Sequence, residues 1–131
     1  MPQSIAPYLL YEDGAAAVTF LTSAFGFEEK ERMVEPDGRV RHAELRLGDD
    51  NLYLGQPGGD YRGPKRLGAS TVLLHVFVDD VDAHCARARA AGADIVEEPA
   101  DQEYGDRRYA AEDPEGHVWY FAQRTEDGGR G

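Results

Sequence analysis

The chain has 131 residues, which suits one compact domain or two small modules that share a core. Its formal net charge of −11 repels phosphate backbones, so we expect no nucleic-acid partner. The single cysteine, Cys85, cannot form an intramolecular disulfide, which fits a reducing compartment. We find no signal peptide and no long apolar span, and therefore expect a soluble cytoplasmic protein with no membrane partner.

In chain order, the first predicted elements are a strand and a helix. An apolar run at residues 7–11 predicts the strand, and apolar residues at helical spacing predict a helix at residues 14–25. Asp13 is a suitable N-cap for this helix, and Gly26 follows as a stop. Two further strand-like runs follow, VRHAELRL and NLYLG, after the hairpin signal EPDGR.

The second half of the chain repeats this order. A strand is predicted at residues 71–78 and a helix at residues 81–91, and three strand-like runs follow, IVEE, RRYAAE and HVWYFAQ. Asp80 is the N-cap of this helix, as Asp13 is of the first, and the two aspartates are 67 residues apart. Tyr53 and Tyr120 have the same separation, so the pattern indicates a duplicated module.

The predicted organisation is therefore one structural domain made of two modules. The first module covers residues 1–55 and the second covers residues 71–123. The segment at residues 56–70 is rich in Gly and Pro and is predicted to be the linker. The end of the chain, residues 124–131, is predicted to be a disordered tail.

Several motifs resemble the vicinal oxygen chelate superfamily, the group of glyoxalases, bleomycin-resistance proteins and extradiol dioxygenases. They are the Asp-capped helices of two βαβββ modules, the segment VDDVDA, the helix end AFGF and the turn DPEGH, and the resemblance runs from about Ser4 to Gln123. It implies an α+β fold, with two tandem βαβββ modules forming curved mixed sheets around a shared cavity. Members of this group are commonly dimers, so a homodimer is expected.

The resemblance also implies where a metal would be bound. Metal-dependent members carry ligands early in the first strand and on the last strand of each module, and these points fall on Ala6, Tyr53, Leu73 and Tyr120. Alanine and leucine cannot bind a metal, and neutral tyrosine is a poor ligand where a divalent ion needs His, Glu or Gln. We therefore expect no metal cofactor at the usual positions.

Strand periodicity predicts which side chains line the cavity instead. In the strand at residues 71–78, Leu73, His75 and Phe77 should face inward, while His42 and Glu44 should do so in VRHAELRL. The predicted ligand-binding residues are Tyr8, Tyr53, Leu73, Phe77, Tyr109 and Tyr120. Tyr109 is included because it follows His42 by 67 residues. Such an aromatic lining suits a planar or amphipathic small molecule.

Three hypotheses remain open for His42, Glu44 and His75, the candidate catalytic residues. They could form an unusual metal site with two imidazoles and one carboxylate. A His–Glu pair could instead perform acid–base catalysis without a metal. The third hypothesis is that these side chains orient a ligand by hydrogen bonds. His84, on the second predicted helix, is expected to be exposed.

The leading functional hypothesis is a metal-independent small-molecule-binding protein that could sequester an aromatic or cationic compound. It depends on the missing metal ligands and on the aromatic lining. The alternative is a glyoxalase-like lyase, isomerase or dioxygenase that uses His42, Glu44 and His75, with or without a divalent metal. The fold alone does not decide between them, because it supports many chemistries.

Overall fold

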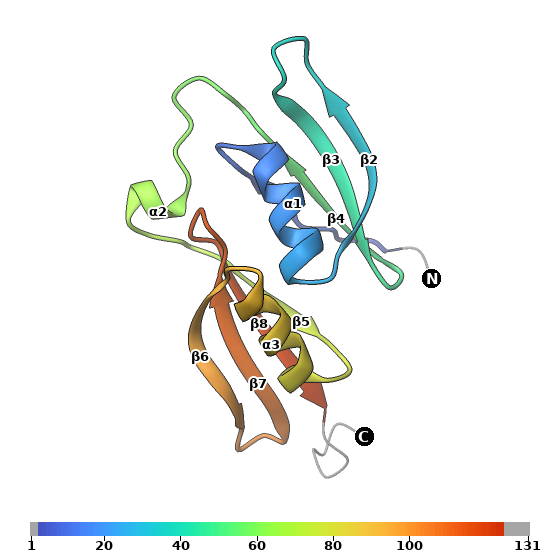
Figure 1. Cartoon of the computed structure of the whole chain (residues 1–131), viewed down its shortest axis with the longest axis vertical. Coiled ribbons are helices and arrows are strands. Elements are labelled where there is room, and N and C mark those ends of the chain that lie inside the picture. Colours follow the sequence, from blue (N-terminus) through green and yellow to red (C-terminus); the bar gives the residue numbers. More distant parts are fainter. Residues whose placement is uncertain (1–2, 125–131) are drawn as a thin grey trace.

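The computed structural model describes residues 3–124, which form two βαβββ modules joined by a linker (Figure 1). The first module consists of β1 Tyr8–Leu10, α1 Gly14–Ala24, β2 Glu28–Val34, β3 Val40–Leu47 and β4 Asp50–Gly55. The second consists of β5 Leu73–Phe77, α3 Val81–Ala90, β6 Asp94–Asp101, β7 Asp106–Glu112 and β8 Val118–Arg124. Residues 125–131 of the predicted disordered tail lie outside the described residues.

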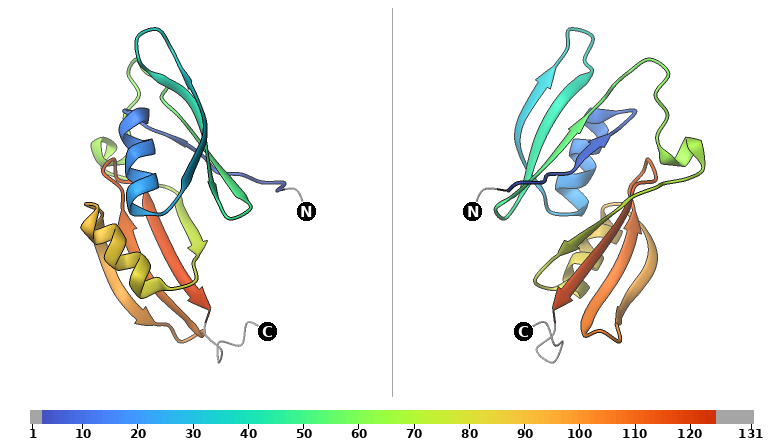
Figure 2. Two further views of the ribbon diagram at one scale, coloured as in Figure 1. Left: turned by 45° about the vertical axis from the view of Figure 1, so that its right-hand side comes forward. Right: turned by 180° about the vertical axis from the view of Figure 1, so that it is seen from behind.

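Each module forms its own four-stranded mixed sheet. The strand order is β1-β4-β3-β2 in the first sheet and β5-β8-β7-β6 in the second, and the first strand of each module pairs in parallel with the last. The sheets do not join into a closed barrel. Helices α1 and α3 lie in front of their sheets in Figure 1, and the view from behind in Figure 2 presents the opposite faces. The predicted α+β fold with tandem βαβββ modules is confirmed.

The same caps start both long helices. The Asp13 carboxylate accepts a hydrogen bond from the Ala16 N–H at 3.0 Å, and the Asp80 carboxylate accepts one from the Ala83 N–H at 3.0 Å. Each bond satisfies one of the amide donors that a helix N-terminus leaves unpaired. Both predicted helices are confirmed, and each ends one residue before its predicted end.

Two elements were not singled out by the sequence. Strand β2 has the sequence EEKERMV, which lacks apolar alternation because the strand is an exposed sheet edge. Its charged side chains disfavour pairing of this edge with another chain. The linker contains a single helical turn, α2 Pro64–Leu67. Proline begins this turn, where its missing N–H is not needed, and Gly68 ends it with φ of 81° in the left-handed region.

One hydrophobic core connects the two modules. Phe25, at the end of α1, packs its ring 5.2 Å from that of Trp119 and 4.7 Å from that of Phe121, both on β8. All three side chains are fully buried. Burial of such large aromatic surfaces is the main force that fixes one module against the other.

The DPEGH turn is a second connection between the modules. The Asp113 carboxylate, buried in this turn, accepts hydrogen bonds from the Tyr11 hydroxyl at 2.6 Å and from the Trp119 indole N–H at 3.2 Å. Burial alone would raise the pKa of the Asp113 carboxyl, but hydrogen bonds from His117, Tyr11 and Trp119 outweigh it and lower that pKa. The turn therefore has a structural role in joining the second module to the end of β1.

Candidate functional site

The first candidate surface is the face of the first sheet that α1 leaves uncovered. We call it the first open face, and it carries Tyr8, His42, Glu44 and Tyr53. Tyr53 on β4 is paired with Tyr8 on β1 and with Glu44 on β3, so these three side chains form one row across the sheet. The structure thus brings together four of the predicted site residues.

Aromatic contacts organise this first open face. The Tyr8 hydroxyl and His42 Nδ1 are joined by a hydrogen bond of 2.9 Å. The His42 and Tyr53 rings stack with centroids 5.5 Å apart, and those of Tyr8 and Tyr53 are 6.0 Å apart. Tyr8 is 51% exposed and both His42 and Tyr53 are partly exposed, so these rings face solvent rather than a closed core.

The corresponding surface of the second sheet lies opposite α3. We call it the second open face, and it carries Leu73, His75, Phe77 and Tyr120. His75 on β5 is paired with Tyr120 on β8, and the His75 and Phe77 rings are 5.1 Å apart. This set was predicted from strand alternation.

Two arginines cover the rings of the second open face. Arg124 lies 3.6 Å from the centre of the Phe77 ring, and Arg108 lies 4.7 Å from that of Tyr120. Both geometries are those of cation–π contacts. Arg108 also donates to Glu97 at 3.2 Å, and the Tyr120 hydroxyl donates to the same carboxylate at 3.3 Å. Nothing in the sequence selects Arg108, Glu97 or Arg124 as a site residue.

The prediction for Tyr109 is wrong. This side chain is 0% exposed and lies in the core, because Tyr109 pairs with Phe121 just as Ala43 pairs with Leu54 in the first sheet. The separation between equivalent residues of β3 and β7 is thus 66, not 67. A shift of one residue turns a side chain to the other face of a sheet. Arg108, not Tyr109, is therefore the counterpart of His42.

The expectation that His84 is exposed is also wrong. It lies between the modules, where Nδ1 is 2.6 Å from the Tyr109 hydroxyl and Nε2 is 3.0 Å from the Phe25 carbonyl oxygen. A carbonyl can only accept, so Nε2 carries the proton and Nδ1 accepts from Tyr109. Burial lowers the pKa of His84, and the same cause raises the pKa of Tyr109.

The candidate residues do not assemble into a metal site within one chain. His42 and Glu44 lie on the first sheet and His75 on the second. Within residues 3–124, no three His, Cys, Asp or Glu side chains come close enough together to hold a metal ion. The positions at which the resemblance would place metal ligands carry Ala6, Tyr53, Leu73 and Tyr120, and these side chains lack the His, Glu or Gln donors that a divalent ion needs.

A cleft of about 770 Å³ lies between the two modules. The free edge of β5 lines it, together with Phe25, His84 and Trp119, and His75 and Phe77 reach it from the second open face. His42, Glu44 and Tyr53 are not part of its lining. The first open face is therefore an uncovered surface in the single chain.

Comparison with known proteins identifies the class to which this architecture belongs. The family model of the Glyoxalase/Bleomycin resistance protein/Dioxygenase superfamily matches residues 4–121. The chain belongs to this superfamily, which confirms the resemblance carried by its motifs.

Individual relatives agree with this assignment. The structure of TioX from Micromonospora sp. ML1 is similar with a TM-score of 0.78 and 35% identity, over 95% of this chain and 100% of TioX. A glyoxalase/bleomycin resistance protein/dioxygenase from Nocardioides shares the fold, with a TM-score of 0.71 and 23% identity, over 100% of this chain and 89% of that protein. Uncharacterized protein Mb0911c of Mycobacterium bovis is 38% identical, over 92% of this chain and 82% of its own length.

None of the helices within residues 3–124 has the length and apolar character needed to cross a membrane.

Proposed function

We propose that this protein binds an aromatic or cationic small molecule on its open sheet faces without using a metal. The observation that carries the proposal is the first open face, where Tyr8, His42 and Tyr53 present stacked rings beside the Glu44 carboxylate. Binding sites for organic ligands typically combine aromatic surface with a few polar groups that orient the ligand. The free buried thiol of Cys85 is consistent with a cytoplasmic location for this role.

A homodimer is part of this proposal. Large apolar side chains are exposed on both open faces, including Leu10 at 40% on the first and Leu73 at 47% on the second, and a second copy would cover them. Association would also enclose the first open face, which a single chain leaves uncovered. Sedimentation velocity of the purified protein should therefore report a dimer, and a monomer at all concentrations would contradict this part of the proposal.

A thermal-shift screen of aromatic and cationic compounds tests the binding function. A ligand at 100 times its Kd should add about 2.7 kcal/mol to the free energy of unfolding. With a confirmed ligand, Tyr53→Ala and Tyr120→Ala should each weaken binding by at least about tenfold, as expected for a lost stacking contact.

The matched control is Leu67→Ala, which removes an exposed apolar side chain from α2, away from both faces. It should leave affinity unchanged. Unchanged affinity in both tyrosine variants would remove the open faces from the binding site.

Enzymatic activity is the second candidate, and the Tyr8–His42 pair is the observation that favours it. A phenol and an imidazole joined at 2.9 Å on an accessible surface could transfer a proton to or from a bound substrate. His75 on the other sheet would be a second acid–base group. Turnover of a lyase, isomerase or dioxygenase substrate that survives in both His42→Ala and His75→Ala would exclude these histidines from any such reaction.

A further inference from the structure

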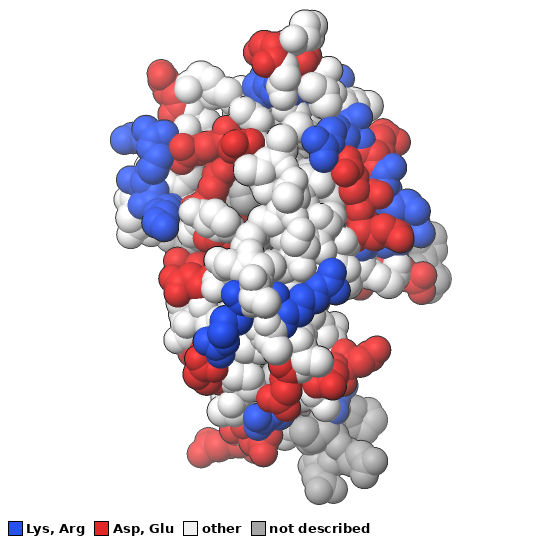
Figure 3. All heavy atoms as spheres, viewed as in Figure 1, with Lys and Arg blue, Asp and Glu red and all other residues white. Residues whose placement is uncertain are grey.

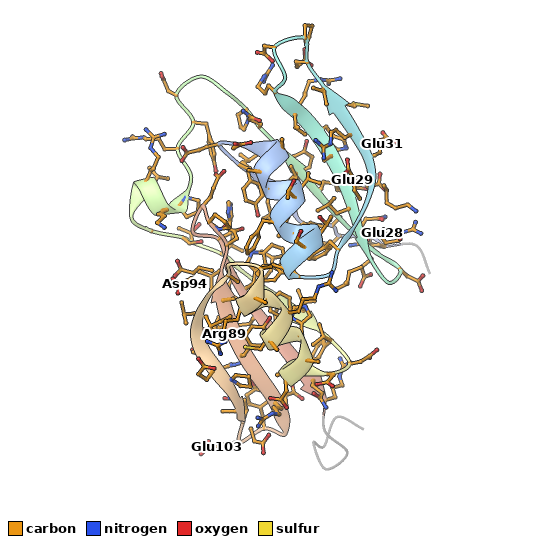
Figure 4. All side chains as sticks on the ribbon, viewed as in Figure 1. Glu28, Glu29, Glu31, Arg89, Asp94 and Glu103 are labelled. Carbon is orange, nitrogen blue, oxygen red and sulfur yellow. The ribbon has the colours of Figure 1, made fainter. Side chains whose placement is uncertain are left out.

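Two carboxylates of like charge are paired on the first open face. Strands β2 and β3 pair Glu31 directly with Glu44, after a register shift between Glu29 and Glu31. Residues that are paired across strands point to the same face, so the row of Tyr8, Tyr53 and Glu44 continues to Glu31 at the sheet edge. Figure 4 labels Glu31 on β2, beyond Glu28 and Glu29 along the strand.

Neighbouring carboxylates of the same hairpin are neutralised, but this pair is not. Figure 3 shows acidic and basic side chains side by side along β2, and ion pairs join Arg32 to Glu29 at 2.8 Å and Lys30 to Glu28 at 3.9 Å. Within residues 3–124, neither Glu31 nor Glu44 forms an ion pair or a side-chain hydrogen bond.

The nearest basic residue along β3 does not neutralise either carboxylate. Arg46 follows Glu44 by two residues on the same face of the strand, and it forms an ion pair with neither carboxylate. Like charges directly opposite one another destabilise a sheet. A bound cation would remove this repulsion.

The aromatic rings make the site more specific than a pair of carboxylates. Tyr53 lies directly opposite Glu44, and its ring is flanked by those of Tyr8 and His42. The face of an aromatic ring attracts a cation and also stacks on a planar group. The row therefore offers a stacking surface at one end and negative charge at the other.

We propose that this row binds an organic cation, in which an amine or amidine group lies between Glu31 and Glu44 and a planar ring lies on Tyr53. The inference deepens the proposed binding function and depends on it, since it names the ligand class of the same face. It also assigns a role to Glu31, which no motif in the sequence indicates.

Two fluorescent probes separate charge from stacking. Proflavine is a planar cation at pH 7, and acridine has the same three-ring system without the charge. Proflavine should bind the wild-type protein at least about tenfold more tightly than acridine, the factor expected for one charge-assisted contact. Replacing both carboxylates, Glu31→Gln with Glu44→Gln, should lower proflavine affinity by at least about tenfold and leave acridine affinity unchanged.

Two controls accompany the probes. Glu103→Gln removes the same charge from the β6–β7 hairpin of the other module, labelled in Figure 4, and should change neither affinity. Without any probe, the Glu31→Gln/Glu44→Gln variant should be more stable than wild type at low salt, because its repulsion is gone. Loss of stability in that variant would contradict an uncompensated pair.

The possible outcomes separate this inference from the proposed function. If neutral screening compounds bind and proflavine does not, the cation site is wrong and the binding function remains. If no compound binds at all, both are wrong. If the Glu31→Gln/Glu44→Gln variant instead dissociates a dimer that wild type forms, the two carboxylates belong to the dimer contact, which also overturns the cation site.

Discussion

The two modules have the same βαβββ topology but differ in the side chains on their open faces. His42 and Glu44 of the first sheet have Arg108 and Ala110 as counterparts in the second, according to the strand pairings with β4 and β8. The first face thus has uncompensated negative charge beside stacked rings. On the second, Arg108 lies over Tyr120 and is neutralised by Glu97.

Contacts that hold each module together are repeated much more closely. The Gly14 N–H at the start of α1 donates to the side-chain oxygen of Gln56 at 2.9 Å, and the Val81 N–H at the start of α3 donates to that of Gln123 at 2.8 Å. Duplication has therefore kept the helix starts and changed the exposed sheet residues. The side chains that start the helices are therefore separate from those of the proposed binding face, as expected for a scaffold that supports many chemistries.

The largest predicted effect concerns Asp113, whose turn in the second module contacts the first module. Asp113→Ala removes a buried carboxylate that accepts from Tyr11 and Trp119, and leaves both donors without this partner. We expect a loss of about 3 kcal/mol in the free energy of unfolding, measured by chemical denaturation.

The control for this variant is the turn between β3 and β4 of the first module. Asp49 there is exposed, so Asp49→Ala should change the free energy of unfolding by less than about 0.5 kcal/mol. Similar losses in the two variants would show that the DPEGH turn does not join the modules as described.

The repeated glutamines should behave alike, which sharpens the comparison. Gln56→Ala and Gln123→Ala each remove the acceptor of one amide at a helix N-terminus. Each should lower the free energy of unfolding by about 1 kcal/mol, the usual effect of a lost cap. Thermal denaturation that shows a loss for only one of the two would mean that the modules are not equivalent at their helix starts.

The smallest predicted effect is a pH dependence at the contact between the modules. Burial lowers the pKa of His84 below the ordinary value of about 6.5, so the folded protein favours the neutral ring more than the unfolded chain does. Its contribution is present above about pH 6.5 and is lost as the pH falls through the folded-state pKa.

The melting temperature of wild type should therefore fall between pH 7 and pH 5 more than that of His84→Gln. Asp113 does not contribute to this difference in melting temperature. Its pKa is lowered, so its contribution to stability is lost only at more acidic pH. Parallel pH profiles for the two proteins would remove His84 as the cause.

How far the sequence predicts this molecule depends on the kind of feature. Helix starts were predictable from Asp13 and Asp80, because a capping side chain acts within three residues. Tyr53 and Tyr120 were correctly placed as equivalent positions by their constant separation. Tyr109 was not, because the separation is 66 residues between β3 and β7 but 67 between β4 and β8, and only strand pairing reveals that difference.

Features between distant segments could not be predicted at all. The exposure of His84 was predicted from the pattern of α3 alone. Its burial depends on Phe25, at the end of α1. The pairing of Glu31 with Glu44 depends on a register shift in an edge strand that has no apolar pattern. Local sequence carries no signal for either contact.

Ligand binding with and without metal tests the central claim most directly. The Kd of a confirmed ligand should be measured by calorimetry on chelator-treated protein and on protein loaded with Zn, Mn, Fe, Ni or Co. We predict the same Kd in every case, with no metal retained after desalting. Affinity that is lost on chelation and restored by one metal, bound near one equivalent per chain, would contradict a metal-independent binding protein.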